Sequence, residues 1–152
     1  MILDVGSADT KFPNELKNRG HEVYSLDISK NEGNDKINSI ICTLEKIPFK
    51  NDIFDLITAI STIEHVGLGR YGDAISPEGD INALREMKRV LKPNGKLILT
   101  LPSGIDTICY SKQRIPLHRV YSSHKLNKIL SGFLILELSY VIKRNGIWFP
   151  GT

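Results

Sequence analysis

The chain has 152 residues, of which 41% are hydrophobic and 24% are charged, with a formal net charge of +3. This length favours one domain with a sizeable buried core, and the composition excludes disordered, collagen-like and coiled-coil proteins. The longest nearly apolar runs, residues 54–60 and 133–138, are far shorter than the about 20 residues that a membrane-spanning helix requires.

The charge pattern and the two cysteines indicate the setting of the protein. Lys and Arg are scattered, without the basic run that is typical of a nucleic-acid footprint. Cys42 and Cys109 have no partner motif and can build neither a disulfide framework nor a zinc site. No secretory signal pattern precedes the first apolar residues. We expect a cytoplasmic protein with no nucleic-acid partner, no membrane span and no metal.

Apolar runs alternate with helical patterns in the first hundred residues, the order that produces a parallel sheet covered by helices. A helix over residues 10–19 has Pro13 in its first turn and Gly20 after its end. A polar loop is predicted over residues 30–36. The predicted strands cover residues 1–5, 22–27, 38–42, 55–60 and 96–101.

The clearest helix pattern covers residues 78–91 and is ended by Pro93-Asn94-Gly95. Its apolar residues form one stripe: Ile81, Leu84, Met87, Val90 and Leu91. The charged residues between them are predicted to face water: Arg85, Glu86, Lys88 and Arg89.

The last part of the chain predicts a short helix followed by a hairpin. The helix covers residues 123–130, and the Phe, Leu, Ile, Tyr and Val content of residues 133–143 predicts a strand after it. Asn145-Gly146 then gives the signal of a type I′ turn. We therefore predict that residues 147–149 fold back antiparallel to that strand.

Two residues at predicted strand ends indicate a ligand. Gly6 lies where the first strand meets the first helix, and Asp27 ends the second strand about twenty residues later. Each has a structural alternative, because tight turns need Gly and an Asp often caps a helix or forms a turn. Their spacing together predicts an adenosine-type ligand whose ribose hydroxyls bind Asp27.

Four sequence blocks follow one another over residues 1–102: ILDVGSA (2–8), YSLD (24–27), LEKIPF with FDLI (44–49 and 54–57), and LREMKRVLKPNGK (84–96). In this order they resemble the motifs of class I methyltransferases that use S-adenosylmethionine, in particular the small-molecule group. The chain departs from the usual pattern at Ala8 and Thr10, where the family commonly has Gly. It also departs at Thr43, where the family often has an acidic residue.

This resemblance implies an α/β, Rossmann-like, mostly parallel sheet with helices on both faces and the strand order 3-2-1-4-5-7-6. Residues 1–152 would be a single S-adenosylmethionine-binding domain that lacks the family's N-terminal helix and most of its antiparallel seventh strand. A short seventh strand would leave the fifth strand unpaired, so we expect self-association through that open edge.

The resemblance also implies the cofactor residues. Asp4 would orient the amino-acid end of the cofactor, and Asp27 would bind the ribose hydroxyls. The remaining cofactor residues are Gly6, Ser7, Ala8 and Ser61 around the methionine part and Ile28, Thr43 and Leu44 around the adenine.

The acceptor would approach after the fourth strand. His65 titrates near neutral pH and is a candidate general base, with a loop-fixing histidine as the alternative. Arg70, Tyr71 and Asp73 are spaced by glycines as in a lid over the acceptor, or they belong to a solvated loop. His118, with Arg119 and Tyr121, follows Pro116 in the region where the family builds acceptor pockets.

The function predicted from these features is S-adenosylmethionine-dependent transfer of a methyl group to a small-molecule or saccharide- or lipid-linked acceptor. One alternative is a non-catalytic S-adenosylmethionine-binding module. Another is a nicotinamide-dependent oxidoreductase, although the third glycine and the Tyr-x-x-x-Lys pair of that class are lacking.

Overall fold

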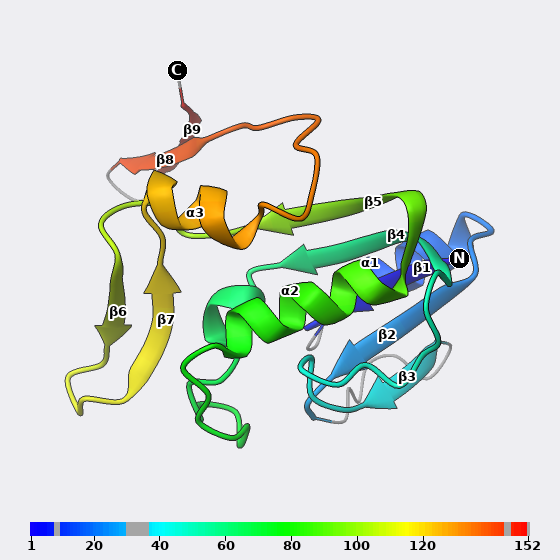
Figure 1. Cartoon of the computed structure of the whole chain (residues 1–152), viewed down its shortest axis with the longest axis horizontal. Helices are drawn as coiled ribbons and strands as arrows, with labels where there is room; N and C mark the ends of the chain where they lie inside the picture. The colour runs from blue at the N-terminus through cyan, green and yellow to red at the C-terminus, as the bar shows by residue number, and fades with distance from the viewer. Residues whose placement is uncertain (8–9, 30–36, 145–146, 152) are drawn as a thin grey trace.

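The computed structural model describes residues 1–7, 10–29, 37–144 and 147–151. A five-stranded parallel sheet lies at its centre in the order β3-β2-β1-β4-β5 (Figure 1). Its strands are β1 (Ile2–Val5), β2 (Val23–Asp27), β3 (Asn38–Ile41), β4 (Phe54–Ile60) and β5 (Leu91–Thr100). The Rossmann-like class and the order of the first five strands are thus confirmed, while the loop predicted over residues 30–36 lies outside the described residues.

Helices cover both faces of this sheet. In Figure 1, α2 (Gly79–Val90) crosses in front of the sheet and α1 (Phe12–Asn18) lies behind it. Pro13 is in the first turn of α1, and Gly20 follows its end with φ +88°, as the sequence predicts. A single 3-10 turn, η1 (Ile63–His65), follows β4.

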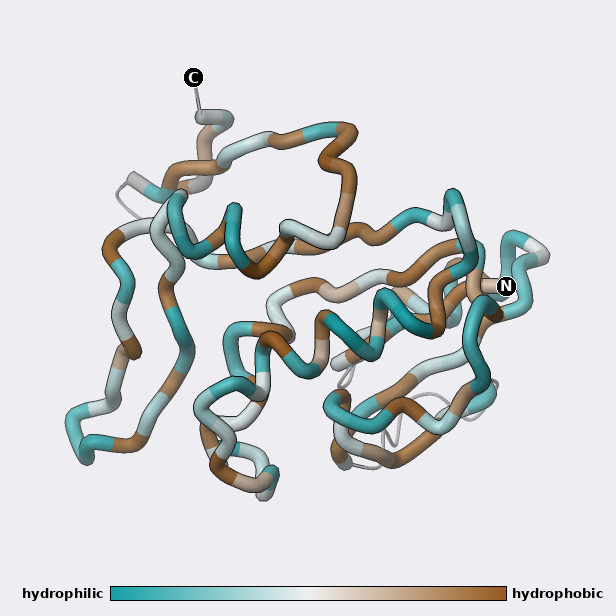
Figure 2. Tube along the Cα trace, viewed as in Figure 1, coloured by the Kyte–Doolittle hydropathy of each residue, from teal (hydrophilic) through white to brown (hydrophobic). Residues whose placement is uncertain are grey.

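The core forms between α2 and the sheet. The predicted stripe of α2 is buried at Leu84, Met87 and Val90, against Leu3 of β1 and Ile57 of β4. Full burial of each such side chain stabilises the fold by roughly 1.5–3 kcal/mol. Hydrophilic and hydrophobic residues alternate along α2 in Figure 2, as expected for a helix with one buried face.

The end of α2 differs in part from the prediction. Glu86 and Arg89 are only partly exposed to water, because they contact the segment after β3, as described below. β5 is assigned from Leu91, which pairs with Phe54, but its regular pairing with β4 begins at Lys96, where the sequence predicts the strand. Between these two pairs the register shifts, and Asn94 has φ +65°, so Pro93-Asn94-Gly95 interrupts the chain after α2 as predicted.

A hairpin and a short helix follow the sheet. β6 (Thr107–Tyr110) and β7 (Pro116–Val120) pair antiparallel outside the central sheet. The helix predicted at residues 123–130 is present as α3 (Ser123–Ile129). Its N-cap Ser122 accepts a hydrogen bond from the amide of Lys125 over 3.2 Å, which satisfies one of the free N–H groups of the first turn.

The long strand predicted at residues 133–143 is wrong. Only its end belongs to β8 (Val141–Arg144), which pairs antiparallel with β9 (Ile147–Pro150). The predicted reversal of residues 147–149 is therefore confirmed, although the Asn145-Gly146 turn lies outside the described residues. β8 and β9 form a sheet of their own, so residues 147–149 do not lie between the fifth strand and the strand of residues 133–143, as the predicted seventh strand would.

The first part of the segment 133–143 forms no strand because it has no partner strand. Leu134 is 84% exposed and Leu136 75% exposed, and Figure 2 shows hydrophobic stretches on this outer loop. A high β-propensity forms a strand only where a neighbour supplies hydrogen bonds and packing. Among the described residues no strand covers the outer edge of β5, and the self-association predicted from that edge stays a prediction.

Every helix of the described part of the chain is too short or too polar to cross a membrane.

Candidate functional site

A cavity opens at the carboxyl edge of the sheet, where the ends of four strands meet. β1 is the strand from which the chain order runs in both directions, and ligands of open α/β sheets bind at such a switch point. Gly6 lies at its centre, after β1. One side, here called the β2–β3 wall, consists of Asp27, Ile28, Ser29, Cys42, Thr43, Leu44 and Glu45. The other side, the β4 wall, consists of Ser61, Thr62, His65, Val66, Tyr71 and Asp73.

Gly6 is required by the geometry of the turn. Its φ is +68°, and a Cβ atom at this position would overlap the side chain of Thr62. Thr62 is itself fixed, because its Oγ1 donates to the carbonyl oxygens of Val5 at 3.1 Å and Ile60 at 3.0 Å. Gly6 is therefore needed for the packing of this turn, and it also lines the cavity.

Asp27 lies on the β2–β3 wall with its carboxylate oriented by the next turn. Its Oδ1 accepts hydrogen bonds from the backbone amide and the hydroxyl of Ser29, at 3.2 and 3.3 Å. Ile28 lines the cavity between these two residues. An acidic side chain and an apolar side chain thus lie together at the end of β2, as the predicted ribose and adenine contacts require.

Asp4 and Ser7 are buried and are not among the residues that line the cavity. Thr58 Oγ1 donates to Asp4 Oδ1 at 2.5 Å, and Ser7 Oγ shares a hydrogen bond with Ser25 Oγ. Burial raises the pKa of Asp4 to about 6, and the negative charge of Asp27 adds to this shift while the Thr58 bond opposes it. Ala8, also predicted in this turn, lies outside the described residues.

The end of β3 and the segment after it supply the rest of the β2–β3 wall. Thr43 and Leu44, predicted beside the adenine, both line the cavity, and Leu44 is buried. Burial raises the pKa of the Cys42 thiol to about 11, so this cavity residue is protonated and unreactive near neutral pH. Glu45 accepts hydrogen bonds from Ser76 Oγ at 2.9 Å and Asn82 Nδ2 at 3.3 Å.

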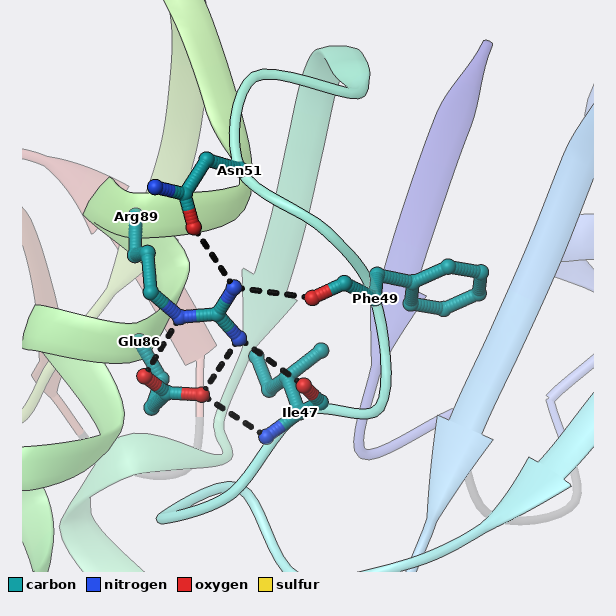
Figure 3. A network of polar contacts seen from close by, with 5 residues as sticks. All are labelled: Ile47, Phe49, Asn51, Glu86 and Arg89. Carbon is teal, nitrogen blue, oxygen red and sulfur yellow. Dashed lines mark hydrogen bonds and ion pairs between the residues drawn. The ribbon is translucent and has the colours of Figure 1, made fainter.

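Glu86 and Arg89 of α2 hold this segment in place (Figure 3). The Arg89 guanidinium forms a two-pronged ion pair with Glu86, with Nε–Oε1 and Nη2–Oε2 distances of 2.7 Å. It also donates to the carbonyl oxygens of Ile47 at 2.9 Å and Phe49 at 2.8 Å, and to Asn51 Oδ1 at 3.0 Å. The Ile47 amide donates back to Glu86 at 2.9 Å. The pair therefore fixes the backbone that follows Thr43 and Leu44.

His65 lies on the β4 wall at the end of η1. Its Nδ1 is 2.6 Å from the carbonyl oxygen of Leu117 on β7. A carbonyl only accepts, so Nδ1 carries the proton and Nε2 is the basic nitrogen of the neutral ring. Burial lowers the pKa of His65, and the charge of Arg70 adds to this shift, while the Leu117 bond and Asp73 oppose it. This geometry is compatible with both roles predicted for His65, a general base and a histidine that fixes the loop.

The predicted lid is a loop closed by Asp73. Its carboxylate accepts from the amides of Gly67 at 2.7 Å, Gly69 at 3.2 Å and Tyr71 at 3.1 Å. Tyr71 lines the cavity, with its ring 5.7 Å from that of His65. Arg70 is not among the lining residues; it donates to the Leu117 carbonyl at 3.1 Å.

The residues predicted after Pro116 do not line the cavity. His118 lies near it, with its ring 6.2 Å from the ring of His65. Arg119 and Tyr121 are buried against Asp80 of α2, with Arg119 Nε 3.6 Å and Tyr121 Oη 3.1 Å from Asp80 Oδ2. This burial raises the pKa of Tyr121.

Arg119 also holds the β4 wall. Its guanidinium donates to the carbonyl oxygens of Val66 at 2.5 Å and Ser76 at 3.2 Å. It therefore fixes both ends of the loop that carries Tyr71 and Asp73. The sequence gives no sign of this role, because Arg119 is 43 residues or more from these partners.

Sequence reasoning missed five of the lining residues: Ser29, Cys42, Glu45, Thr62 and Val66. Each lies within two residues of one that was predicted, so proximity to the motifs was the signal that could have found them. The described residues bring no group of three or more His, Cys, Asp or Glu side chains together in a way that could hold a metal ion.

Comparison with other proteins places the chain among known sequences. A family model described as "Caenorhabditis protein of unknown function, DUF268" matches residues 1–145. An uncharacterized protein of Methanocaldococcus jannaschii is 33% identical over 104 residues, which are 66% of this chain and 40% of that protein. The ubiquinone/menaquinone biosynthesis C-methyltransferase UbiE of Paraburkholderia phytofirmans is 28% identical over 134 residues, 79% of this chain and 47% of that protein. The chain spans less than half the length of these curated relatives.

Solved structures are similar over nearly the whole chain. The Burkholderia thailandensis 1,6-didemethyltoxoflavin-N1-methyltransferase, with S-adenosylhomocysteine bound, superposes with a TM-score of 0.74 at 15% identity, covering 98% of this chain and 67% of that one. A SAM-dependent methyltransferase of Methanosarcina mazei gives a TM-score of 0.70 at 16% identity, covering 98% and 87%. The chain therefore has the class I methyltransferase fold.

Proposed function

The chain belongs to the DUF268 family, and we propose that it is an S-adenosylmethionine-dependent methyltransferase domain acting on a small-molecule or a saccharide- or lipid-linked acceptor. The observation that carries this proposal is the position of Gly6 and Asp27 at one cavity, at the switch point of a class I methyltransferase fold. Two similar proteins are named a 1,6-didemethyltoxoflavin-N1-methyltransferase and a ubiquinone/menaquinone biosynthesis C-methyltransferase, and these names support a small organic acceptor.

The residues present fit the cofactor. Gly6 lines the cavity and has no side chain, so a ligand can approach its backbone. The Asp27 carboxylate would accept hydrogen bonds from the ribose hydroxyls, and Ile28 and Leu44 would pack against the adenine. Asp4, buried behind this turn, would act on the amino-acid end through its neighbours or through water.

The chemistry demands little else of the chain. When bound, S-adenosylmethionine supplies a methyl group that its sulfonium already activates. Holding the acceptor in line with that methyl group provides most of the catalysis, and Ser61, Thr62 and Tyr71 of the β4 wall would form this side of the pocket. His65 Nε2 would accept a proton where the acceptor is an oxygen or nitrogen atom.

Calorimetric titration of the purified chain with S-adenosylhomocysteine, and separately with NAD, tests the proposal. We expect binding of S-adenosylhomocysteine and none of NAD. Binding of NAD alone would favour an oxidoreductase and overturn the proposal, as would binding of neither ligand by a chain that is folded by circular dichroism. Binding without methyl transfer to any of a panel of acceptors would favour a non-catalytic binding module.

A further inference from the structure

A buried carboxyl group lies directly beside the candidate base. The side chain of Glu64 is only 3% exposed, and its Oε1 is 3.9 Å from Nε2 of His65. Its Oε2 accepts no hydrogen bond from any of the described residues. Buried polar atoms are nearly always paired, so an orphaned carboxylate oxygen next to a cavity calls for an explanation.

The ionised form of Glu64 is unfavourable in this position. Burial raises its pKa, while hydrogen bonds with its own backbone amide and with Ser61, and the charge of His118, oppose the shift. Taking a carboxylate out of water without full pairing costs several kcal/mol. A proton or a neighbouring positive charge would remove this cost.

Besides His118, His65 can supply such a charge, because its Nε2 lies 3.9 Å from Oε1 of Glu64. Because Nδ1 is engaged with the Leu117 carbonyl, protons enter and leave the ring at Nε2, the atom that is close to Glu64. The charged and titratable groups around the pair come from four parts of the chain. They are Arg70 and Asp73 on the loop after η1, His118 and Arg119 on β7, Tyr121 directly after β7, and Asp80 on α2.

We propose that Glu64 is a positioning residue for His65, and that the Glu64 carboxylate and His65 Nε2 bind one proton as a pair. In methylation of an oxygen or nitrogen acceptor, the bond from the acceptor to the methyl carbon forms as the sulfur–carbon bond breaks. The acceptor's proton passes to His65 Nε2. The buried pair then changes from a net charge of −1 to 0, so accepting the proton places a positive charge beside the buried Glu64 carboxylate.

The methylation step rests on the proposed function, but the proton pair does not. It is therefore tested in the chain without cofactor or acceptor. NMR titration follows the ring protons of His65 and the carboxyl carbon of Glu64 in the wild-type chain. We expect both nuclei to show the same inflections, because strongly interacting groups titrate as one unit.

Glu64→Gln removes the charge at nearly constant shape. We expect the pKa of His65 to fall by at least about 0.7 pH unit, the effect of a charge at this distance even with the dielectric constant of water. The matched control is Glu78→Gln, an exposed acid at the N-cap of α2, which should leave the titration of His65 unchanged.

Different inflection points for the His65 ring protons and the Glu64 carboxyl carbon in the wild-type chain would overturn the proposal. This measurement does not depend on the folding of any variant. An unchanged His65 pKa in a folded Glu64→Gln chain would overturn it as well. Failure of S-adenosylhomocysteine to bind would instead count against the proposed function and leave the proton pair standing.

Discussion

The two walls of the cavity are fixed by ion pairs of different burial. The β2–β3 wall is held by Arg89 and Glu86, whose side chains are 31% and 21% exposed. The β4 wall is held by Arg119 and Asp80, which are 5% and 2% exposed. In both cases an arginine reaches backbone carbonyls of a segment that lines the cavity.

This difference should decide how each wall tolerates change. Partly exposed ion pairs contribute about 0–1 kcal/mol, because water and salt screen them. Removing one partner of a buried pair costs about 3–5 kcal/mol, since the other charge remains in the interior. We therefore expect the β4 wall to be coupled to global stability and the β2–β3 wall to be locally adjustable.

The largest effect is expected on the β4 wall at His65. If it is the base for an oxygen or nitrogen acceptor, His65→Ala should lower turnover by ~10²–10⁴ and leave cofactor affinity almost unchanged. Steady-state rates and the dissociation constant of S-adenosylhomocysteine measure the two effects. Normal turnover with a lower melting temperature would identify His65 as the loop-fixing histidine.

Arg119→Met tests the buried arginine of the same wall. We expect the free energy of unfolding to fall by about 3–5 kcal/mol, because Asp80 loses its counter-charge and the Val66 and Ser76 carbonyls lose a donor. Urea unfolding measures this change. Arg85→Met, on the exposed face of α2, is the control and should cost less than about 1 kcal/mol. Equal losses in both variants would contradict the comparison of the walls.

Asp27→Ala tests the β2–β3 wall directly. Hydrogen bonds to a charged acceptor contribute roughly 1.5–3 kcal/mol, so the affinity for S-adenosylhomocysteine should fall at least ~tenfold with the fold unchanged. Calorimetry measures the affinity and circular dichroism the fold. Glu22→Ala, an exposed acid just before β2, should bind normally. An unchanged dissociation constant for Asp27→Ala would remove this residue from the site.

Asp4 lies on β1 between the walls, and its ionisation should make stability depend on pH. Its folded pKa of about 6 is above the ordinary value of 3.8, so its favourable contribution is full below 3.8 and is lost as the pH rises through 6. Asp4→Asn should therefore gain stability relative to the wild type between pH 4 and 7, by on the order of 2 kcal/mol. Urea unfolding at several pH values measures this difference, and a constant difference would show that Asp4 does not titrate in this range.

Arg89→Lys should have the smallest effect. Lysine keeps the charge but loses the planar fork that reaches Glu86 and the Ile47 and Phe49 carbonyls together. We expect less than about 1 kcal/mol of lost stability and a ~2–5-fold weaker affinity for S-adenosylhomocysteine. Arg85→Lys is the matched control. A loss of stability as large as that of Arg119→Met would show that the β2–β3 wall is not locally adjustable.

The sequence by itself determined the central sheet and the centre of the cavity. The strands around Val5, Asp27 and Ile60 were predictable from their apolar runs, and α2 from its period of 3.6 residues, because both are local signals. Gly6, Asp27 and His65 were predictable because they follow strand ends, and parallel strands bring those ends to one edge. Their chemical roles could be predicted from their residue types and positions alone, without their contacts to distant parts of the chain.

Only the tertiary structure decided which charges are buried and which apolar segments find a partner. The backbone carbonyls that Arg89 and Arg119 bind are 40 or more residues away in the chain, so the sequence does not show these contacts. Glu64 shows its unpaired oxygen only once η1 packs beside β7. The segment after Phe133 has the composition of a strand, yet it remains unpaired until β8, because a strand exists only where another strand accepts its hydrogen bonds.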